Sequence, residues 1–311
     1  MSAPLSIGII GARGHVGAQL LALIAGHPEL ELSFASSRAK AGEPVAAFAG
    51  QIYENLSPQE AAKRGADLVF LALPNGHAAR WVEAIEAVSP KTRLIDISAD
   101  MRFEQSWAYG LPELNREAIK GARRIANPGC YASAAQLAIA PLAKLLAAPP
   151  VIFGVSGYSG AGATPGPRND PAQLADNLLP YGLTGHGHEA EISHRLDRPV
   201  HFIPHVAAFF RGLSVSVDMR LAEPLAESAL RSRYEEFYAG EAFVKLVDEA
   251  PQVRQVAGTH GARIGGFALG DGGRRVVMVA VLDNLLKGAA SQAVQNLNLA
   301  FGLEEDTGLA P

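Results

Sequence analysis

The chain has 311 residues and a formal net charge of −4, with 27 lysines and arginines against 31 aspartates and glutamates. This length predicts two domains, and the 48 % of hydrophobic and 19 % of charged residues exclude a disordered chain. No basic run is present, so we expect no nucleic-acid partner, and the single cysteine, Cys130, excludes an intrachain disulfide. Prolines and polar residues interrupt the uncharged stretch 125–143, so we expect no membrane partner. Because the N-terminus also lacks the basic start of a signal peptide, we expect a cytoplasmic protein.

Short apolar runs alternate with segments of helical spacing in the first half of the chain. The predicted strands are 6–10, 30–35, 68–72, 93–97 and 124–126. The predicted helices between them are 16–25 and 77–87. Strands that alternate with helices indicate an α/β domain with a doubly wound parallel sheet of the Rossmann type.

The second half of the chain has a different pattern. Its predicted strands are 151–156, 213–219, 263–269 and 275–282, and its predicted helices are 132–146, 225–238 and 285–301. Alternating apolar and polar residues, with turn signals between the runs, indicate an α+β domain with a mixed or antiparallel sheet. The Gly- and Pro-rich connection 157–187 is longer than an ordinary loop, so we expect it to carry function.

A glycine-rich turn, GARGHVG at 11–17, joins the first predicted strand to the first predicted helix. Glycines allow a tight turn and the close approach of a pyrophosphate, and the helix start offers N–H groups to phosphate. This context favours dinucleotide binding, and the alternative is a tight turn without a ligand. The expected cofactor contacts in the turn are Gly11, Arg13, Gly14, His15, Val16 and Gly17.

The end of the second predicted strand favours NADP(H) over NAD. NAD-binding domains place an acid at this point to bind the ribose 2′-hydroxyl, whereas this strand ends in Ser36, Ser37 and Arg38. Hydroxyls and a guanidinium suit a 2′-phosphate, which a carboxylate would repel. The alternative for Arg38 is an ordinary surface residue.

Cys130 follows the bend Asn127-Pro128-Gly129 and directly precedes a predicted helix. Unpaired N–H groups and the dipole at a helix start favour the thiolate form of a cysteine. We therefore expect Cys130 to be a nucleophile, and the alternative is a buried, inert cysteine.

The connection 157–187 ends in His186-Gly187-His188. A neutral imidazole near a thiolate can accept and return its proton, so both histidines are candidates for acid–base catalysis. A metal site and a purely structural pair remain as alternatives. Upstream, the run 156–162 is too rich in glycine for a strand; it could present N–H groups to an oxyanion or a nicotinamide, or be a flexible connector.

Several motifs together resemble the N-acetyl-γ-glutamyl-phosphate reductase family. The most specific is IANPGCYASA at 125–134, around Cys130. The resemblance extends over nearly the whole chain through GIIGARGHVGAQLL at 8–21, DISADMRF at 96–103, GVSGYSGAG at 154–162, HGHEAEI at 186–192 and DNLLKGAA at 283–290.

The resemblance implies an NADP-binding domain of residues 1–129 and 284–311, to which the last helix returns, and a substrate-binding and catalytic domain of residues 130–283. It also implies an NADPH-dependent reductase that converts N-acetyl-γ-glutamyl phosphate into N-acetylglutamate 5-semialdehyde and phosphate through a cysteine thioester. The partners would be this small acyl phosphate and further copies of the chain, in a homodimer or homotetramer.

The resemblance also implies roles for individual residues. Cys130 would form the thioester, His186 would be the acid or base with His188 as the less favoured choice, and no metal would be involved. The implied substrate contacts are Arg102 on the phosphate, Asn127, Tyr181, Glu191 and Arg211. Further implied cofactor contacts are Leu73, Pro74, Ser159, Gly160, Gly162 and Asn284.

Two other functions remain open. The chain could be a related enzyme with the same thioester chemistry, such as aspartate-semialdehyde dehydrogenase or the aminoadipyl-phosphate reductase of lysine synthesis. It could also be a non-catalytic NADP sensor that kept the fold. The histidine motif favours the first family over aspartate-semialdehyde dehydrogenase, and the reactivity of Cys130 would distinguish an enzyme from a sensor.

Overall fold

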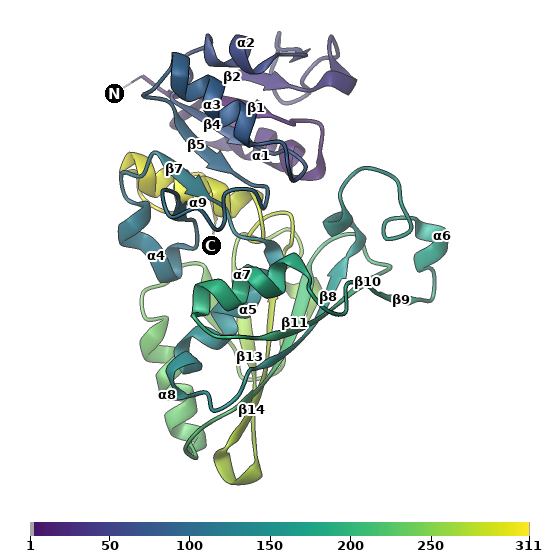
Figure 1. Cartoon of the computed structure of the whole chain (residues 1–311), viewed down its shortest axis with the longest axis vertical. Helices are drawn as coiled ribbons and strands as arrows, with labels where there is room; N and C mark the ends of the chain where they lie inside the picture. Colours follow the sequence, from purple (N-terminus) through teal and green to yellow (C-terminus); the bar gives the residue numbers. More distant parts are fainter. Residues whose placement is uncertain (1–2, 311) are drawn as a thin grey trace. The chain divides into compact units, whose positions relative to one another are not determined.

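The computed structural model describes residues 3–310, which divide into two compact units (Figure 1). The first unit holds the chain up to Gly129 together with Ala289–Ala310, and the second unit holds Cys130–Gly288. Residues 284–288, which we expected in the cofactor domain, fall in the second unit by this division.

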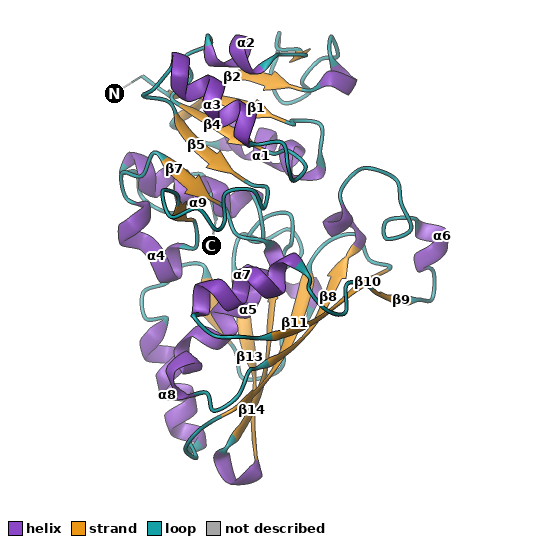
Figure 2. Cartoon of the chain, viewed as in Figure 1, coloured by secondary structure: helices purple, strands orange, loops and turns teal. Residues whose placement is uncertain are grey.

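The first unit is built on a seven-stranded sheet in the order β3-β2-β1-β4-β5-β7-β6, with every pairing parallel. Its strands are β1 (Leu5–Ile10), β2 (Leu30–Ser36), β3 (Tyr53–Glu54), β4 (Leu68–Leu71), β5 (Arg93–Asp96), β6 (Ala108–Tyr109) and β7 (Arg124–Ala126). Its helices are α1 (His15–Gly26), α2 (Pro58–Ala62), α3 (Ala79–Val88), α4 (Pro112–Ile119) and α9 (Ala290–Phe301). The predicted Rossmann-type sheet is confirmed (Figure 2). Its central strands, such as β4, are apolar runs because they are buried on both faces.

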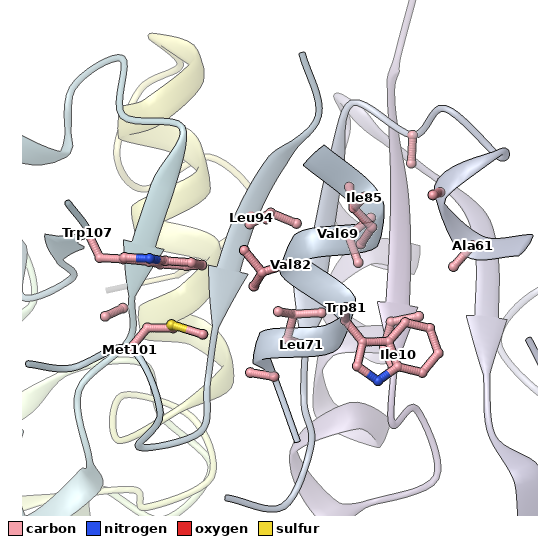
Figure 3. Close-up of a cluster of buried hydrophobic side chains, with 14 of the residues drawn as sticks. Ile10, Ala61, Val69, Leu71, Trp81, Val82, Ile85, Leu94, Met101 and Trp107 are labelled. Carbon is pink, nitrogen blue, oxygen red and sulfur yellow. The ribbon is translucent and has the colours of Figure 1, made fainter. Parts of the chain in front are cut away.

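Helix α3 is held on this sheet by a hydrophobic cluster (Figure 3). Trp81, Val82 and Ile85 on α3 join Val69 and Leu71 of β4 in that cluster. Because the helix and the strand share one core, the loop between them, which carries predicted cofactor contacts, is fixed at both ends.

Helix α9 is buried along nearly its whole length, polar side chains included. Gln292 Nε2 and Asn296 Nδ2 both donate to the carbonyl oxygen of Gly110 at 2.8 Å, so these amides find partners inside the first unit. The predicted helix 285–301 was wrong in its start. The Asp283 carboxylate accepts the backbone N–H groups two and three residues further on, which holds that stretch in a turn.

The second unit is built on a seven-stranded mixed sheet in the order β12-β13-β14-β11-β8-β10-β9, which confirms the predicted α+β part. The pairings β8–β10 and β12–β13 are parallel and the others are antiparallel. The strands are β8 (Val151–Gly157), β9 (Leu178–Pro180), β10 (His201–Ala207), β11 (Leu213–Arg220), β12 (Val244–Leu246), β13 (Ala262–Gly270) and β14 (Arg275–Leu282). The helices are α5 (Cys130–Ile139), α6 (Pro171–Leu174), α7 (Gly187–Leu196) and α8 (Glu227–Phe237). Helix α5 packs on β11 and β14, and α7 packs beside α5 and on β10.

The face of this sheet that points away from α5 carries apolar side chains. Residues of β8 alternate between buried and exposed, and Val151 and Phe153 are 40 % and 39 % exposed. In one row across the sheet, Phe153 pairs with Ile203 of β10 and with Ser216 of β11, and Ser216 pairs with Val279 of β14. Three of the four side chains in this row are apolar, and Ser216 interrupts them.

Several predicted boundaries differ from the structure. The predicted helix 132–146 begins at Cys130 and gives way after Ile139 to a 3-10 helix, because Pro141 lacks the N–H that an α-helix needs. The run 156–162 is a strand through Gly157 and a 3-10 turn afterwards. Strand β10 and helix α7 were not predicted, because polar residues interrupt their apolar patterns.

Candidate functional site

Cys130 is the first residue of α5, where the sequence predicted a helix start, and it is half-buried. Gly288 lies directly against it, since a Cβ at Gly288 would stand 2.6 Å from the Cys130 Cβ. Only glycine therefore leaves room for Cys130 here. The N–H groups and dipole of the first helical turn favour the thiolate.

A pocket in the second unit opens beside Cys130. Its lining comes from the start of α5, the end of β8, the connection 157–187, the start of α7 and β10. The lining residues are Cys130, Tyr131, Ser156, Gly157, Gly160, Ala161, Arg168, Tyr181, His188 and Val206. The structure thus brings the predicted Tyr181 and His188 together with the cysteine.

The two histidines occupy different places at the start of α7. His186 is the N-cap, and its Nδ1 accepts the backbone N–H of His188 at 3.1 Å. The two rings meet edge to face at 4.9 Å between centroids, but only His188 lines the Cys130 pocket. Burial, and next the Arg168 charge, lower the pKa of His186, which keeps it neutral at pH 7 against the opposing effect of Glu189 and Glu191.

Two tyrosines line the same pocket as neutral phenols. Burial raises the pKa of Tyr181 to about 12, with a further rise from the Cys130 charge. Burial also raises the pKa of Tyr131, whose hydroxyl donates to the carbonyl oxygen of His205 at 2.8 Å. Both side chains can therefore donate hydrogen bonds across the whole physiological pH range.

The other predicted substrate contacts of the second unit lie outside this pocket lining. Glu191 is buried on α7, and its charge raises the pKa of His186. Arg211 Nε lies 2.9 Å from Asp283 Oδ2, in an ion pair whose acidic partner is fully buried. Arg211 thus has a structural partner, and its contact with substrate stays a prediction.

Asn284 ties together the predicted nicotinamide contacts of the second unit. Its Nδ2 donates to Ser159 Oγ at 2.9 Å, and its Oδ1 accepts the backbone N–H of Gly212 at 2.7 Å. A Cβ at Gly160 would stand 3.6 Å from Asn284 Nδ2, and Gly162 adopts a φ of +85° that favours glycine. The structure therefore brings Asn284 to the segment 159–162, of which Gly160 lines the pocket.

The turn 11–17 in the first unit fits a dinucleotide phosphate. Gly11 adopts a φ of +83°, and a Cβ there would collide with the carbonyl oxygen of Ala72. A Cβ at Gly17 would stand 2.7 Å from the backbone of Ala12, so α1 packs tightly on the turn. Gly14 caps α1 without a side chain, which leaves the helix start open to a phosphate. The other predicted contacts of the turn are Arg13, His15 and Val16. The turn follows β1, and Leu73 and Pro74 follow β4; because β1 and β4 are parallel neighbours, both segments lie at the same edge of the sheet.

The end of β2 presents hydroxyls at the same edge of the sheet. Gly11 and Ala12 donate their N–H groups to the carbonyl oxygen of Ser36. Ser36 Oγ accepts the N–H of Leu56, and Ser37 Oγ accepts the N–H of Lys40. In these bonds each Oγ acts as an acceptor. Its hydroxyl proton can therefore still be donated to a phosphate oxygen. Arg38 is exposed next to them.

Arg102 and Asn127 form a buried network inside the first unit. Arg102 Nε donates to the carbonyl oxygen of Asn127 at 3.0 Å, and Nη2 donates to that of Ile97 at 3.1 Å. Asn127 Nδ2 donates to Ala289 O, while its Oδ1 accepts from Asn296. Both atoms of the Asn127 amide are thus bonded to protein, which holds the bend before Cys130 in shape.

No three histidine, cysteine, aspartate or glutamate side chains within residues 3–310 are grouped as a metal site requires. No helix in the same range is both long and apolar enough to cross a membrane.

Sequence reasoning missed Arg168 of the pocket. It lies in a run of prolines and glycines that gives no periodic signal. The available signal was an arginine followed by Asn169 and Asp170, residues that fix turns through their side chains.

Comparisons with known proteins agree with this architecture. The NAD binding domain of semialdehyde dehydrogenases matches residues 6–122, and their dimerisation domain matches residues 130–284. A curated N-acetyl-gamma-glutamyl-phosphate reductase from Xanthomonas campestris pv. campestris (strain B100) is 57 % identical over 311 residues, covering 98 % of both chains. One of the same name from Xylella fastidiosa (strain M23) is 51 % identical, covering 99 % of this chain and 96 % of the relative.

Solved structures show the same fold at low identity. Aspartate semialdehyde dehydrogenase II from Vibrio cholerae has a TM-score of 0.78 at 20 % identity, covering 97 % of this chain and 99 % of its own. The Candida albicans aspartate semialdehyde dehydrogenase, solved with NADP, has a TM-score of 0.70 at 17 % identity, covering 96 % and 99 %. The chain therefore has a domain for a nicotinamide cofactor, and it belongs to the semialdehyde dehydrogenase family and, within it, to the N-acetyl-gamma-glutamyl-phosphate reductases, which are oxidoreductases.

Proposed function

We propose that this chain reduces N-acetyl-γ-glutamyl phosphate to N-acetylglutamate 5-semialdehyde and inorganic phosphate, with NADPH, through a thioester on Cys130. The observation that carries the proposal is the pocket that joins Cys130, at a helix start, to His188 and Tyr181. The identity of 51 to 57 % to curated reductases supports the choice of substrate.

Cys130 opens the reaction. Its thiolate attacks the acyl carbon, so that a carbon–sulfur bond forms, the carbon–oxygen bond to phosphate breaks, and phosphate leaves with the electron pair. A bound nicotinamide cofactor supplies a hydride to the thioester carbon. The resulting thiohemiacetal on Cys130 collapses, which releases the aldehyde and restores the thiolate.

A histidine carries the proton that the departing phosphate requires. It gives this proton to the phosphate as the carbon–oxygen bond breaks and regains one from water, so each turnover takes up one proton from solvent and leaves Cys130 as the thiolate. The sequence favoured His186 for this role. We propose His188 instead, because it lines the Cys130 pocket, whereas His186 Nδ1 is engaged as the cap of α7.

Arg102 is the proposed phosphate ligand. Its guanidinium is buried beside the carbonyl oxygen of Asn127, three residues before Cys130 in the chain. A guanidinium fork matches two phosphate oxygens. The bonds to Asn127 and Ile97 would hold that fork still, so Asn127 acts through Arg102 in this proposal.

The proposed cofactor is NADP(H), held by the turn 11–17 and by Ser36, Ser37 and Arg38. The hydroxyls and the exposed guanidinium suit a 2′-phosphate, and the strand end carries no acid. Glu31 stands at the opposite end of the same strand.

We also propose that two copies of the chain pair through the outer face of the second sheet. Phe153 and Val151 are exposed on this face, Phe153 lies beside the partly exposed Ile203, and the dimerisation domain of the family covers this part of the chain. Phe153→Asp should then reduce the molar mass measured by light scattering, while Phe237→Asp, on the exposed side of α8, should not. An unchanged mass in Phe153→Asp would place the interface elsewhere.

The decisive experiment is the reverse reaction, phosphate-dependent reduction of NADP⁺, with a panel of aldehydes. N-acetylglutamate 5-semialdehyde should be preferred over aspartate semialdehyde and over N-blocked aminoadipate semialdehyde. Cys130→Ser should bind NADPH like the wild type and lose nearly all turnover, because an alcohol does not form the reactive anion at neutral pH. Preference for another aldehyde would move the chain to that substrate. NADPH binding without turnover of any aldehyde would indicate a sensor.

A further inference from the structure

Arg168 is the cation of the Cys130 pocket. The pocket lining within the described chain includes no lysine and no other arginine. Its remaining polar groups are a thiol, a serine hydroxyl, two phenols and His188. An anionic part of a ligand in this pocket would therefore meet one positive charge, and that charge is Arg168.

The Arg168 guanidinium lies over the ring of Tyr181. Its central carbon is 4.8 Å from the centroid of that ring. This cation–π contact uses none of the N–H groups in a hydrogen bond to an oxygen, so the N–H fork can take a planar, two-oxygen acceptor. Within residues 3–310 no hydrogen bond or ion pair occupies that fork, whereas Arg124 and Arg275 each hold a carboxylate with theirs.

The backbone next to Arg168 is held in a defined turn. Asn169 Nδ2 donates to the carbonyl oxygens of Gly162 and Thr164 at 2.8 Å, and its Oδ1 accepts the N–H of Gly166 at 2.7 Å. Asp170 caps the short helix that follows. Arg168 thus lies in a closed turn between Gly166 and Asn169, which bond to each other, and this fixed backbone lowers the entropy lost when the arginine binds a ligand.

The proposed substrate carries two anionic groups, and they need separate partners. Arg102, in the first unit, is the proposed ligand of the phosphate. The carboxylate is planar and has two oxygens, which is the shape that a guanidinium fork fits. We propose that Arg168 binds the carboxylate of the substrate and thereby selects acyl phosphates that carry one. This inference rests on the proposed function.

The test uses Arg168→Met in the reverse reaction, with semialdehyde, phosphate and NADP⁺ each varied in turn. A charge-assisted hydrogen bond contributes about 1.5–3 kcal/mol, so the KM for N-acetylglutamate 5-semialdehyde should rise roughly 10- to 150-fold. The KM for phosphate and for NADP⁺ and the kcat should stay within about twofold. Arg168→Lys keeps the charge without the planar fork, so its KM should be intermediate. Arg233→Met removes an exposed arginine of α8 and should leave every constant unchanged.

A second substrate separates binding from structural damage. 4-Acetamidobutanal differs from N-acetylglutamate 5-semialdehyde only in lacking the carboxylate. Wild type and Arg168→Met should therefore have equal kcat/KM for 4-acetamidobutanal. A raised KM for phosphate would assign Arg168 to phosphate instead, and an equal loss with both aldehydes would show a structural role. Either result, or no change at all, overturns the inference. If the wild type does not oxidise N-acetylglutamate 5-semialdehyde, the proposed function itself has failed.

Discussion

The turn 11–17 and the connection 157–187 are both rich in glycine, but glycine serves a different purpose in each. In the turn, a side chain at Gly11 or Gly17 would strike the backbone of a neighbouring segment. In the connection, a side chain at Gly162, Gly185 or Gly187 would have open space, and only the positive φ of Gly162 and Gly185 still favours glycine there. The turn acts through its backbone, whereas the connection acts through side chains that folding brings to Cys130.

The largest expected effect is a loss of kcat at His188, the residue that directly follows the connection. His188→Asn should lower kcat by about 10²- to 10⁴-fold, the usual contribution of a general acid or base. His186→Asn should stay within about tenfold of the wild type, because asparagine is itself a good N-cap for α7. Steady-state kinetics, with NADPH affinity as the control for folding, check both variants. The opposite ranking would return the proton transfer to His186.

The same contrast explains which parts of the site could be predicted from the sequence. The turn, the start of α5 at Cys130 and the parallel sheet follow from local patterns, namely glycine spacing, helix starts and buried apolar runs. Arg168 joins Cys130 only through the fold of the whole second unit, so no local pattern marks it. Asn127 was predicted as a substrate contact, yet the structure shows its amide bonded on both sides to backbone and to α9, a contact between residues far apart in sequence.

The edge of the first sheet gives the next prediction. Arg38→Ala should weaken NADPH binding at least about tenfold and leave NADH binding nearly unchanged, because only NADPH has the 2′-phosphate that loses a charge-assisted hydrogen bond. Calorimetric titration of both cofactors measures the difference. Equal loss for both cofactors would place Arg38 on the shared pyrophosphate, and equal affinity of the wild type for both would refute the choice of NADP(H).

Two helical glycines test the comparison directly. Gly17→Ala forces a methyl group to within 2.7 Å of the Ala12 backbone, so it should lower the free energy of unfolding by about 1–3 kcal/mol. Gly187→Ala places its methyl group in open space on α7 and should raise that free energy by a few tenths to about 1 kcal/mol. Urea unfolding at pH 7.5 compares the two. A neutral Gly17→Ala would show that the turn tolerates a methyl group at Gly17 as α7 does at Gly187.

The smallest expected effect lies in the first unit, where the chain returns after α9. His27 is buried, its Nδ1 accepts the N–H of Glu29, and its Nε2 lies 3.1 Å from Asn298 Oδ1. These partners require a neutral ring with its proton on Nε2. Asn298 Nδ2 in turn donates to the carbonyl oxygens of Glu305 and Thr307, so the ring supports the C-terminal segment.

Burial lowers the pKa of His27 below its ordinary value of 6.5, against smaller opposing effects of Asn298 and Glu29. Between the lowered pKa and 6.5, His27 is protonated in the unfolded chain and neutral in the folded chain. The free energy of unfolding therefore falls as the pH drops through that window, and above the window His27 does not change it. His27→Gln keeps an N–H donor but cannot titrate. The loss of unfolding free energy between pH 7.5 and pH 5.5 should therefore be smaller in His27→Gln than in the wild type, as measured in urea. Equal losses in the two proteins would assign the acid sensitivity to other buried histidines, such as His260, whose pKa burial also lowers.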